Sequence, residues 1–277
     1  MDLGTRLITS QMAFHTTNGL TAFPLQAELL LLNISLWIIS SRGPAVAYSD
    51  GKGWDMTDLL NLVRQEPLAF LPRISLAAWM QFRGGYQRRM QMELGHFDWG
   101  FDRSDFERWL STKFGVEYPS PIADTSIVSS FFASEEHAFH EYFDLLDEYL
   151  STGDASPAQL RPSSYPSQTF AEFLREIRRR PGMYIGCETF QGCCASLMGD
   201  ARAYSDLRLQ PDRERKLFQE FQEWVERVKN RSSRFRHWHK IVEFWSMGDN
   251  AAYRLFWDWL DEFAGQVGSP DIFKPSE

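Results

Sequence analysis

One stretch decides the fold: Phe170-Ala-Glu-Phe-Leu-Arg-Glu-Ile-Arg-Arg-Arg-Pro-Gly-Met-Tyr-Ile-Gly186. It predicts a short amphipathic helix that ends before Pro181, because the residue before a proline is pushed out of helical space. We expect Gly182 to take a positive φ in the turn that follows. The apolar pair Tyr184 and Ile185 then packs back onto the core. The stretch therefore predicts a helix, a tight turn and a short apolar segment that packs on the core.

A degenerate copy of this stretch lies 114 residues earlier, where Pro67 corresponds to Pro181. At the same spacing Gly85 meets Gly199, and apolar residues meet apolar residues. The apolar pairs are Leu59 and Phe173, Leu60 and Leu174, Val63 and Ile177, Phe70 and Tyr184, and Leu71 and Ile185. A run of matches this long is hard to reach by chance, so it indicates an internal duplication.

The matches continue to the end of both segments. A one-residue insertion aligns Phe106 with Phe221 and Trp109 with Trp224. The 114-residue spacing then returns, and the last matches are Phe131 with Trp245, Phe143 with Trp257, and Leu146-Asp-Glu-Tyr149 with Leu260-Asp-Glu-Phe263. The sequence predicts an all-α fold of two tandem copies of a helical unit, packed with pseudo-twofold symmetry. The copies are expected at residues 56–150 and 169–265, followed by a tail at 266–277.

Helix signals in the first copy are local and strong. The predicted helices start at Thr57 or Asp58, near Ser75, after Ser104 and after Ser134, because these residue types cap helix N-termini. Gly115 is expected to stop the third of these helices in a left-handed conformation. A segment rich in serine and proline, residues 151–168, is expected to link the two copies. Residues 1–55 do not resemble the rest, so we expect an irregular appendage or a stretch translated from an over-extended gene start.

Composition limits the classes of function. The chain is 15% aromatic, so it can fill a core and leave aromatic residues for an interface. Its net charge of −8 argues against a nucleic-acid binder, which needs a basic stripe, and suits ordinary solubility or a basic protein partner.

The cysteines and the longest apolar run bear on location. Three clustered cysteines, Cys187, Cys193 and Cys194, are typical of a reducing compartment, so we expect a cytoplasmic protein. The run from Ala27 to Ile39 is interrupted by polar residues and is too short to span a bilayer, so no membrane association is expected.

The run Arg178-Arg-Arg-Pro-Gly-Met-Tyr-Ile-Gly186 resembles a segment near the start of the ATPase domain of DNA gyrase B subunits. That resemblance implies a Glu four residues before an Asn and an Asp-x-Gly-x-Gly turn, which together bind Mg-ATP. Neither follows Gly186 here, so we do not expect nucleotide hydrolysis. The same run, with the later Phe-x-x-Trp pattern, also resembles small uncharacterised bacterial all-helical proteins of immunity type. This second resemblance implies an immunity-type role and covers most of residues 169–265.

The candidate binding surface combines basic, aromatic and acidic side chains of the second copy. Its residues are Arg178, Arg179, Arg180, Tyr184, Trp259, Asp258, Asp261 and Glu262. Arginines at a helix C-terminus also suit a solvated helix end, and Trp259 also suits packing between the copies. The sequence holds no constellation typical of catalysis, so no catalytic residue, metal site or cofactor is expected.

The resulting hypothesis is a non-enzymatic cytoplasmic protein that binds a protein partner. Its most concrete form is an immunity-type inhibitor that turns an acidic, aromatic face toward a bacterial toxin. One alternative is a small-ligand sensor or enzyme with a cleft between the copies, using Arg180 and Tyr184. The other is a regulatory or structural scaffold.

Overall fold

The computed structural model describes residues 56–117, 124–152, 168–186, 188–230 and 237–275. All regular structure in these segments is helical, which confirms the predicted all-α class. The predicted appendage at 1–55 and most of the predicted linker, at 153–167, lie outside the described residues. We call residues 56–152 the first half and residues 168–275 the second half.

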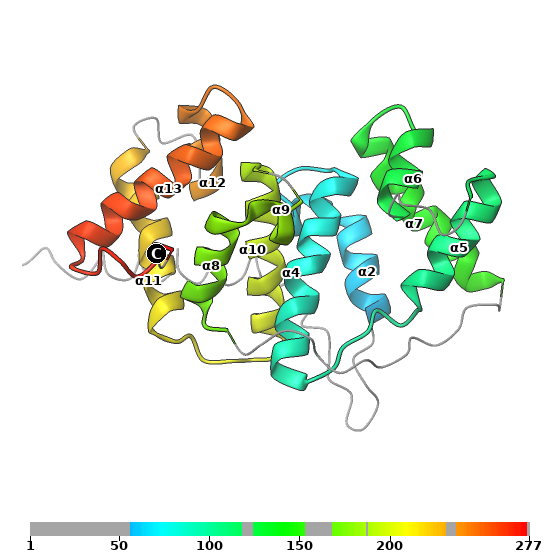
Figure 1. Cartoon of the computed structure of the whole chain (residues 1–277), viewed down its shortest axis with the longest axis horizontal. Helices are drawn as coiled ribbons and strands as arrows, with labels where there is room; N and C mark the ends of the chain where they lie inside the picture. Colours follow the sequence, from blue (N-terminus) through cyan, green and yellow to red (C-terminus); the bar gives the residue numbers. More distant parts are fainter. Residues whose placement is uncertain (1–55, 118–123, 153–167, 187, 231–236, 276–277) are drawn as a thin grey trace, which may run out of the picture. The chain divides into compact units, whose positions relative to one another are not determined.

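The helices of the two halves follow one another in the same order (Figure 1). The first half contains α2 (Met56–Gln65), α3 (Pro67–Phe70), α4 (Leu76–Leu94), α5 (Arg103–Phe114), α6 (Asp124–Phe131) and α7 (Glu135–Ser151). The second half contains α8 (Phe170–Arg179), α9 (Pro181–Tyr184), α10 (Phe190–Asp206), α11 (Arg213–Trp224), the π-helix η1 (Val225–Lys229), α12 (Trp238–Trp245) and α13 (Asp249–Gln266). Each of α8, α9 and α10 starts 114 residues after α2, α3 and α4, respectively.

Capping explains where the helices start. Ser75 caps α4 by accepting a hydrogen bond from the Ala78 amide at 3.3 Å, and Thr189 caps α10 through the Gly192 amide at 3.2 Å. Each cap satisfies an amide that has no partner inside its helix. The predicted Ser134 cap of α7 and the left-handed Gly115 after α5 are also confirmed.

Three local expectations were wrong. The helix α2 already includes Met56, so Thr57 and Asp58 lie inside it and neither is its N-cap. Pro181 starts the one-turn helix α9, and the positive φ falls on Gly186 (69°), so Gly182 is not the left-handed residue. A proline is well placed at a first helical position because its missing N–H has no partner there anyway. The cap of α5 is Asp102 and not Ser104, since the Asp102 carboxylate accepts from the Ser104 and Asp105 amides.

Aromatic side chains fill two hydrophobic cores, one in each half. Phe106 of α5 contacts Tyr142 and Tyr149 of α7, with ring centroids 5.6 and 5.3 Å apart. In the second half, Phe221 of α11 contacts Phe256 and Phe263 of α13 at 5.9 and 5.8 Å. The largest fully buried side chains are all aromatic, and burial of such apolar surface is the main stabilising term for these helices.

The two halves meet along α4 and α10, which lie side by side (Figure 1). Two glycines allow this approach. A Cβ added to Gly85 would lie 2.0 Å from the carbonyl oxygen of Ser196, and one added to Gly199 would lie 1.9 Å from that of Phe82. Each glycine therefore touches the backbone of the opposite helix, and Phe82 and Ser196 are themselves 114 residues apart.

Candidate functional site

The predicted arginines at the end of α8 are divided between structural and exposed positions. Arg178 donates two hydrogen bonds of 2.8 Å to the Asp261 carboxylate, and its guanidinium lies 5.4 Å from the Trp257 ring. This bidentate pair ties α8 to α13. Arg179 pairs with Glu176 on its own helix. Thus two of the three predicted arginines have intramolecular carboxylate partners.

Arg180 precedes the one-turn helix α9, and Tyr184 is its last residue. Arg180 is exposed, whereas Tyr184 is half-buried, with its ring centroid 6.2 Å from that of Phe173. The contact between α4 and α10 is closely packed at Gly85 and Gly199.

The predicted acidic and aromatic face of α13 is largely neutralised. Lys229 of η1 pairs with Glu262 at 2.7 Å, and its ammonium lies 5.3 Å from the ring of Trp259, which is half-buried. Asp261 is taken by Arg178. Of the three predicted carboxylates, Asp258 is exposed and takes no part in these pairs. Four of the eight predicted residues, Arg178, Trp259, Asp261 and Glu262, therefore take part in contacts that join α8, η1 and α13.

Sequence reasoning missed a buried ionic cluster between α4 and α10. The carboxylate of Asp200, fully buried, accepts from Arg88 at 2.6 Å and from Arg89 at 3.1 Å, and also pairs with Arg215 of α11. Burial by itself raises the pKa of Asp200, but the three guanidinium groups outweigh it and lower that pKa to about 2. The sequence offered no signal for it, because its members are spread over helices far apart in the chain.

A second carboxylate extends this cluster. Asp206 accepts from the Tyr86 hydroxyl and from Arg202, each at 3.0 Å, and all three side chains are buried. Burial raises the pKa of Tyr86, and the charge and hydrogen bond of Asp206 raise it further. The cluster joins the halves electrostatically, which fits a structural role.

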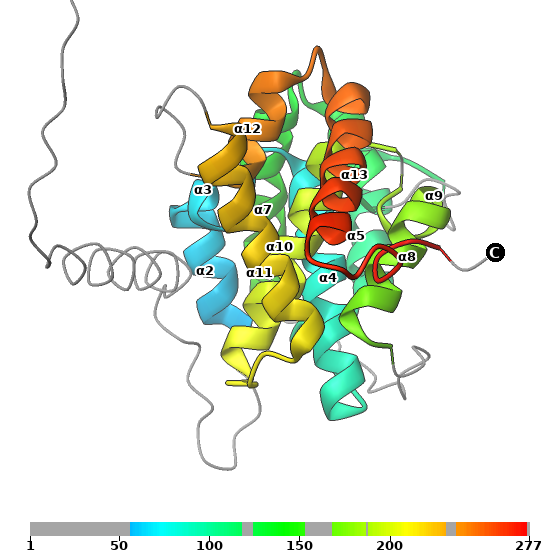
Figure 2. The ribbon, with the colours of Figure 1, turned by 90° about the vertical axis from the view of Figure 1, so that its left-hand side faces the viewer.

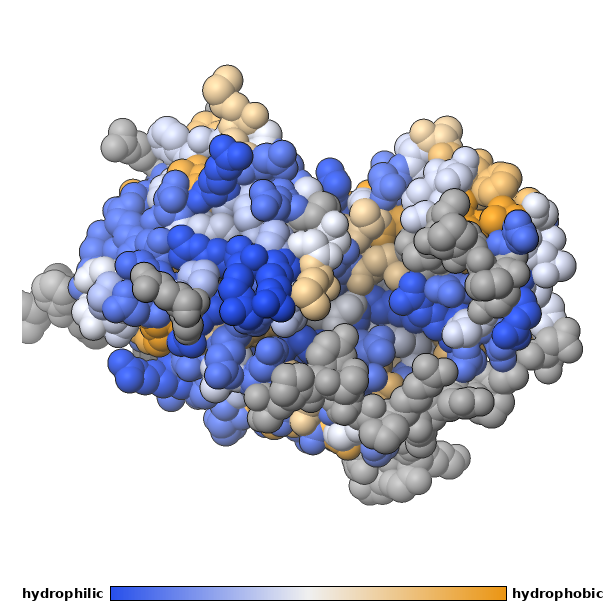
Figure 3. Space-filling view, viewed as in Figure 1, coloured by the Kyte–Doolittle hydropathy of each residue, from blue (hydrophilic) through white to orange (hydrophobic). Residues whose placement is uncertain are grey.

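Large apolar side chains are exposed at corresponding turns of the two halves. At the end of α12, Phe244 is 56% and Trp245 45% exposed, and Met247 in the turn that follows is 100% exposed. At the end of α6, Phe131 is 52% exposed. Figure 3 shows hydrophobic colour at both of these ends. Exposed aromatic and methionine side chains of this kind are typical of protein-binding surfaces.

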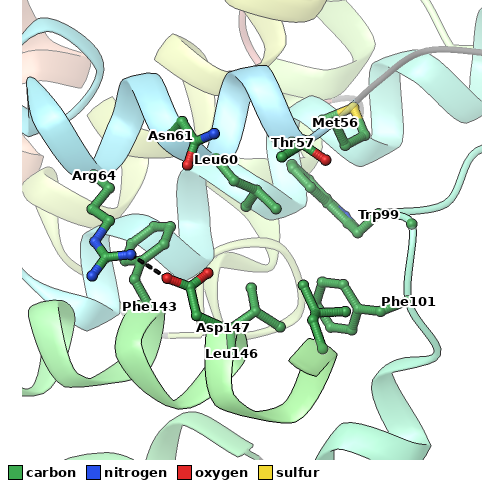
Figure 4. Close-up of a pocket in the computed structure, with 12 residues that line it drawn as sticks. Met56, Thr57, Leu60, Asn61, Arg64, Trp99, Phe101, Phe143, Leu146 and Asp147 are labelled. Atoms are coloured by element: carbon green, nitrogen blue, oxygen red, sulfur yellow. Dashed lines mark hydrogen bonds and ion pairs between the residues drawn. The ribbon is translucent and has the colours of Figure 1, made fainter. Parts of the chain in front are cut away.

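A groove lies between α2 and α7 (Figure 4). It encloses a cavity of about 240 Å³, with Trp99, Phe101 and Phe143 among its apolar lining residues. Arg64 stands at its edge and pairs with Asp144 and Asp147 of α7. The sequence could not reveal this groove, since its lining residues have the same apolar types as fully covered positions elsewhere.

The remaining sequence expectations concern metals, cysteines and membranes. Among the described residues, no group of three or more His, Cys, Asp or Glu side chains is arranged to hold a metal ion. Cys193 and Cys194 are buried, and burial raises the pKa of both thiols, while Cys187 lies outside the described residues. None of the described helices has the length and apolar character needed to cross a membrane.

No protein-family model, curated protein or solved structure matches this chain. The arrangement of the residues themselves is therefore what supports a function.

Proposed function

We propose that this chain carries two copies of one helical unit and works, without catalysis, by binding another protein. The duplication is supported by contacts that recur 114 residues apart. Arg64 pairs with Asp147 as Arg178 pairs with Asp261, and the carboxylate of Glu135 accepts from the Ala77 amide as that of Asp249 accepts from the Gln191 amide. Gly85 lies against the carbonyl of Ser196, and Gly199 lies against the carbonyl of Phe82. Reciprocal contacts of this kind are expected across a pseudo-twofold axis.

The observation that carries the binding function is the exposed apolar end of α12 with the turn that follows it, formed by Phe244, Trp245 and Met247, which we call the α12–α13 tip. Met247 is fully exposed and the two aromatic side chains are about half exposed, and neighbouring apolar side chains are costly to leave in water. Aromatic and methionine residues are enriched among the central residues of protein interfaces. A partner that covers the tip would remove this apolar surface from water.

The most concrete partner is a basic protein, and the proposed role is that of an immunity-type inhibitor of a toxin. The net charge of −8 supports this form of the proposal, because an acidic protein attracts a basic partner over long range. This attraction would come from the whole charge distribution, since Asp261 and Glu262 are paired within the chain.

The test is capture of a partner by the full chain from the cells that produce it. We expect one protein to be enriched by the wild-type chain and lost when the tip carries Phe244→Ser with Met247→Ser. The control is Val267→Ser, because Val267 is also exposed but lies after α13. Equal capture by both variants, or no enriched protein, would refute the role of the tip.

Salt dependence tests the electrostatic part separately. The Debye length falls from about 10 Å at 0.1 M salt to about 3 Å at 1 M. We expect the association rate with the captured partner to fall over this range. A rate that does not change would remove electrostatic attraction from the proposal while leaving the binding itself in place.

A further inference from the structure

The two halves differ in how they cover the same groove. In the second half, the chain after α13 turns back onto α8 (Figure 2). Phe273 is buried in the second core, and Ile272 packs against it. Arg175 of α8 donates a hydrogen bond of 3.1 Å to the carbonyl oxygen of Ile272. The tail thus packs on α8 through Arg175 and on the second core through Ile272 and Phe273.

In the first half, the groove between α2 and α7 remains hollow. Leu150 is 42% exposed, whereas Ala264, 114 residues later, is 1% exposed. Leu60 is half-buried and Thr57 is exposed, whereas their counterparts Leu174 and Ala171 are fully buried. Three lining residues of the cavity, Thr57, Leu60 and Leu150, thus lie 114 residues before positions that are buried in the second half, and a fourth, Asn61, lies 114 residues before Arg175, which binds the tail.

The hollow groove keeps the chemistry that holds the tail. Asn61, exposed beside the cavity, stands at the position of Arg175, and its side-chain amide can donate to a backbone carbonyl as Arg175 does. The cavity is large enough for one or two apolar side chains, and its floor is aromatic and aliphatic.

The rim of the groove is acidic. Asp144 and Asp147 share one cation, Arg64, and both carboxylates are more than half exposed. A basic residue of the ligand next to its apolar anchor would therefore be attracted to this rim. The tail has that pattern, because Lys274 follows Ile272 and Phe273.

We propose that the groove between α2 and α7 binds a short segment of a partner protein with two apolar residues followed by a basic one. This inference rests on the proposed protein-binding function and adds a second contact and its chemistry. A second copy of this chain fits less well as the source of the segment, because its tail is already buried in its own second half.

The probe is a fluorescent peptide with the sequence of residues 268–275, Gly-Ser-Pro-Asp-Ile-Phe-Lys-Pro, titrated with the full chain and followed by anisotropy. We expect saturable binding that weakens at least about tenfold, or about 1.4 kcal/mol, when the peptide Phe is replaced by Ala. Replacing its Lys by Glu should also weaken binding, and more so at low salt.

Three variants of the chain test whether the peptide binds in the groove. Thr57→Arg adds a bulky cation at the exposed edge of the groove, and Leu60→Asp places a charge on its wall; both should abolish binding. Leu68→Asp changes an exposed leucine of α3 outside the groove and should leave binding unchanged. Thr57 is exposed, so its variant is expected to fold, which a matched thermal melt would show.

Several outcomes would overturn the inference. These are no peptide binding to the wild-type chain, binding unchanged by Thr57→Arg, or binding that appears only after residues 1–55 are removed, which would assign the groove to the chain itself. Self-association abolished by Thr57→Arg would instead make the occupant a second copy. A chain that captures a partner through the α12–α13 tip but ignores the peptide would refute this inference alone.

Discussion

The first and second halves share several internal contacts but differ in their surfaces. Both place a lysine over a core tryptophan, with Lys113 5.0 Å from the Trp109 ring and Lys229 4.7 Å from the Trp224 ring. Both lysines also pair with a glutamate of the long helix that follows, Glu148 or Glu262. The core contacts thus recur, whereas the groove beside them is hollow in one half and filled in the other.

The π-helix shows how such a contact is kept when the spacing changes. Lys113 follows Trp109 by four residues, but Lys229 follows Trp224 by five. The wider turn of η1 brings the fifth residue onto the face that the fourth occupies in an α-helix. The lysine–tryptophan contact therefore has a similar distance in both halves, although the helix type differs.

The largest expected effect on stability is at Asp200. This position differs between the halves, because the residue 114 positions earlier is Tyr86. Asp200→Ala leaves Arg88, Arg89 and Arg215 buried without their shared counter-ion. We expect a loss of about 3–5 kcal/mol in the free energy of unfolding, measured by urea denaturation. The control Asp258→Ala removes an exposed carboxylate and should change stability by less than about 0.5 kcal/mol. A loss below about 1 kcal/mol for Asp200→Ala would mean that the cluster does not hold the halves together.

A smaller, symmetric effect is expected at the glycine contact. Gly85→Ala and Gly199→Ala each force a methyl group against the backbone of the opposite helix, so both should lose about 2 kcal/mol. Gly84→Ala is the matched control, because no atom lies within 4 Å of its added Cβ. That variant should gain about 0.5–1 kcal/mol from its better helix propensity. Clearly unequal losses at Gly85 and Gly199 would contradict the equivalence of the two helices.

The smallest effect concerns the pH dependence of the second half alone. Burial raises the pKa of Glu226 in η1 to about 7. Its carboxylate ionises near pH 4.5 in the unfolded chain, so between these values only the folded chain holds the proton. Stability therefore falls as pH rises from about 4.5 through about 7.

Glu226→Gln removes this ionisation. We expect the variant and the wild-type chain to unfold alike at about pH 4.5, and the variant to be more stable by about 1 kcal/mol at about pH 8. Thermal melts at both pH values check this, with Glu220→Gln, on the exposed face of α11, as the control. A constant difference at both pH values would point to packing rather than ionisation.

Much of the fold was predictable because its signals are local. Serine caps, a stopping glycine and apolar periodicity act over a few residues, and they located α4, α7 and the end of α5. The wrong choice of Ser104 as a cap has the same origin: Asp102, two residues earlier, is an equally good capping type, and only the backbone path selects it.

The candidate surface was predicted less well, because residue type does not reveal a partner. Arg178 and Asp261 were both taken for surface residues, but folding pairs them across α8 and α13. The α12–α13 tip includes Met247, which no sequence pattern singled out, and its exposure follows from its place in a turn.

The sequence by itself determined the all-α class and the places of several helices, since capping residues and apolar spacing act along the chain. Only the tertiary structure decided that Gly85 and Gly199 face the opposite backbone, that Asp200 gathers three arginines and that one groove is filled while its counterpart is hollow. These features join residues that are far apart in the chain. Their energies depend on burial and on distances between helices, which local propensity and periodicity do not encode.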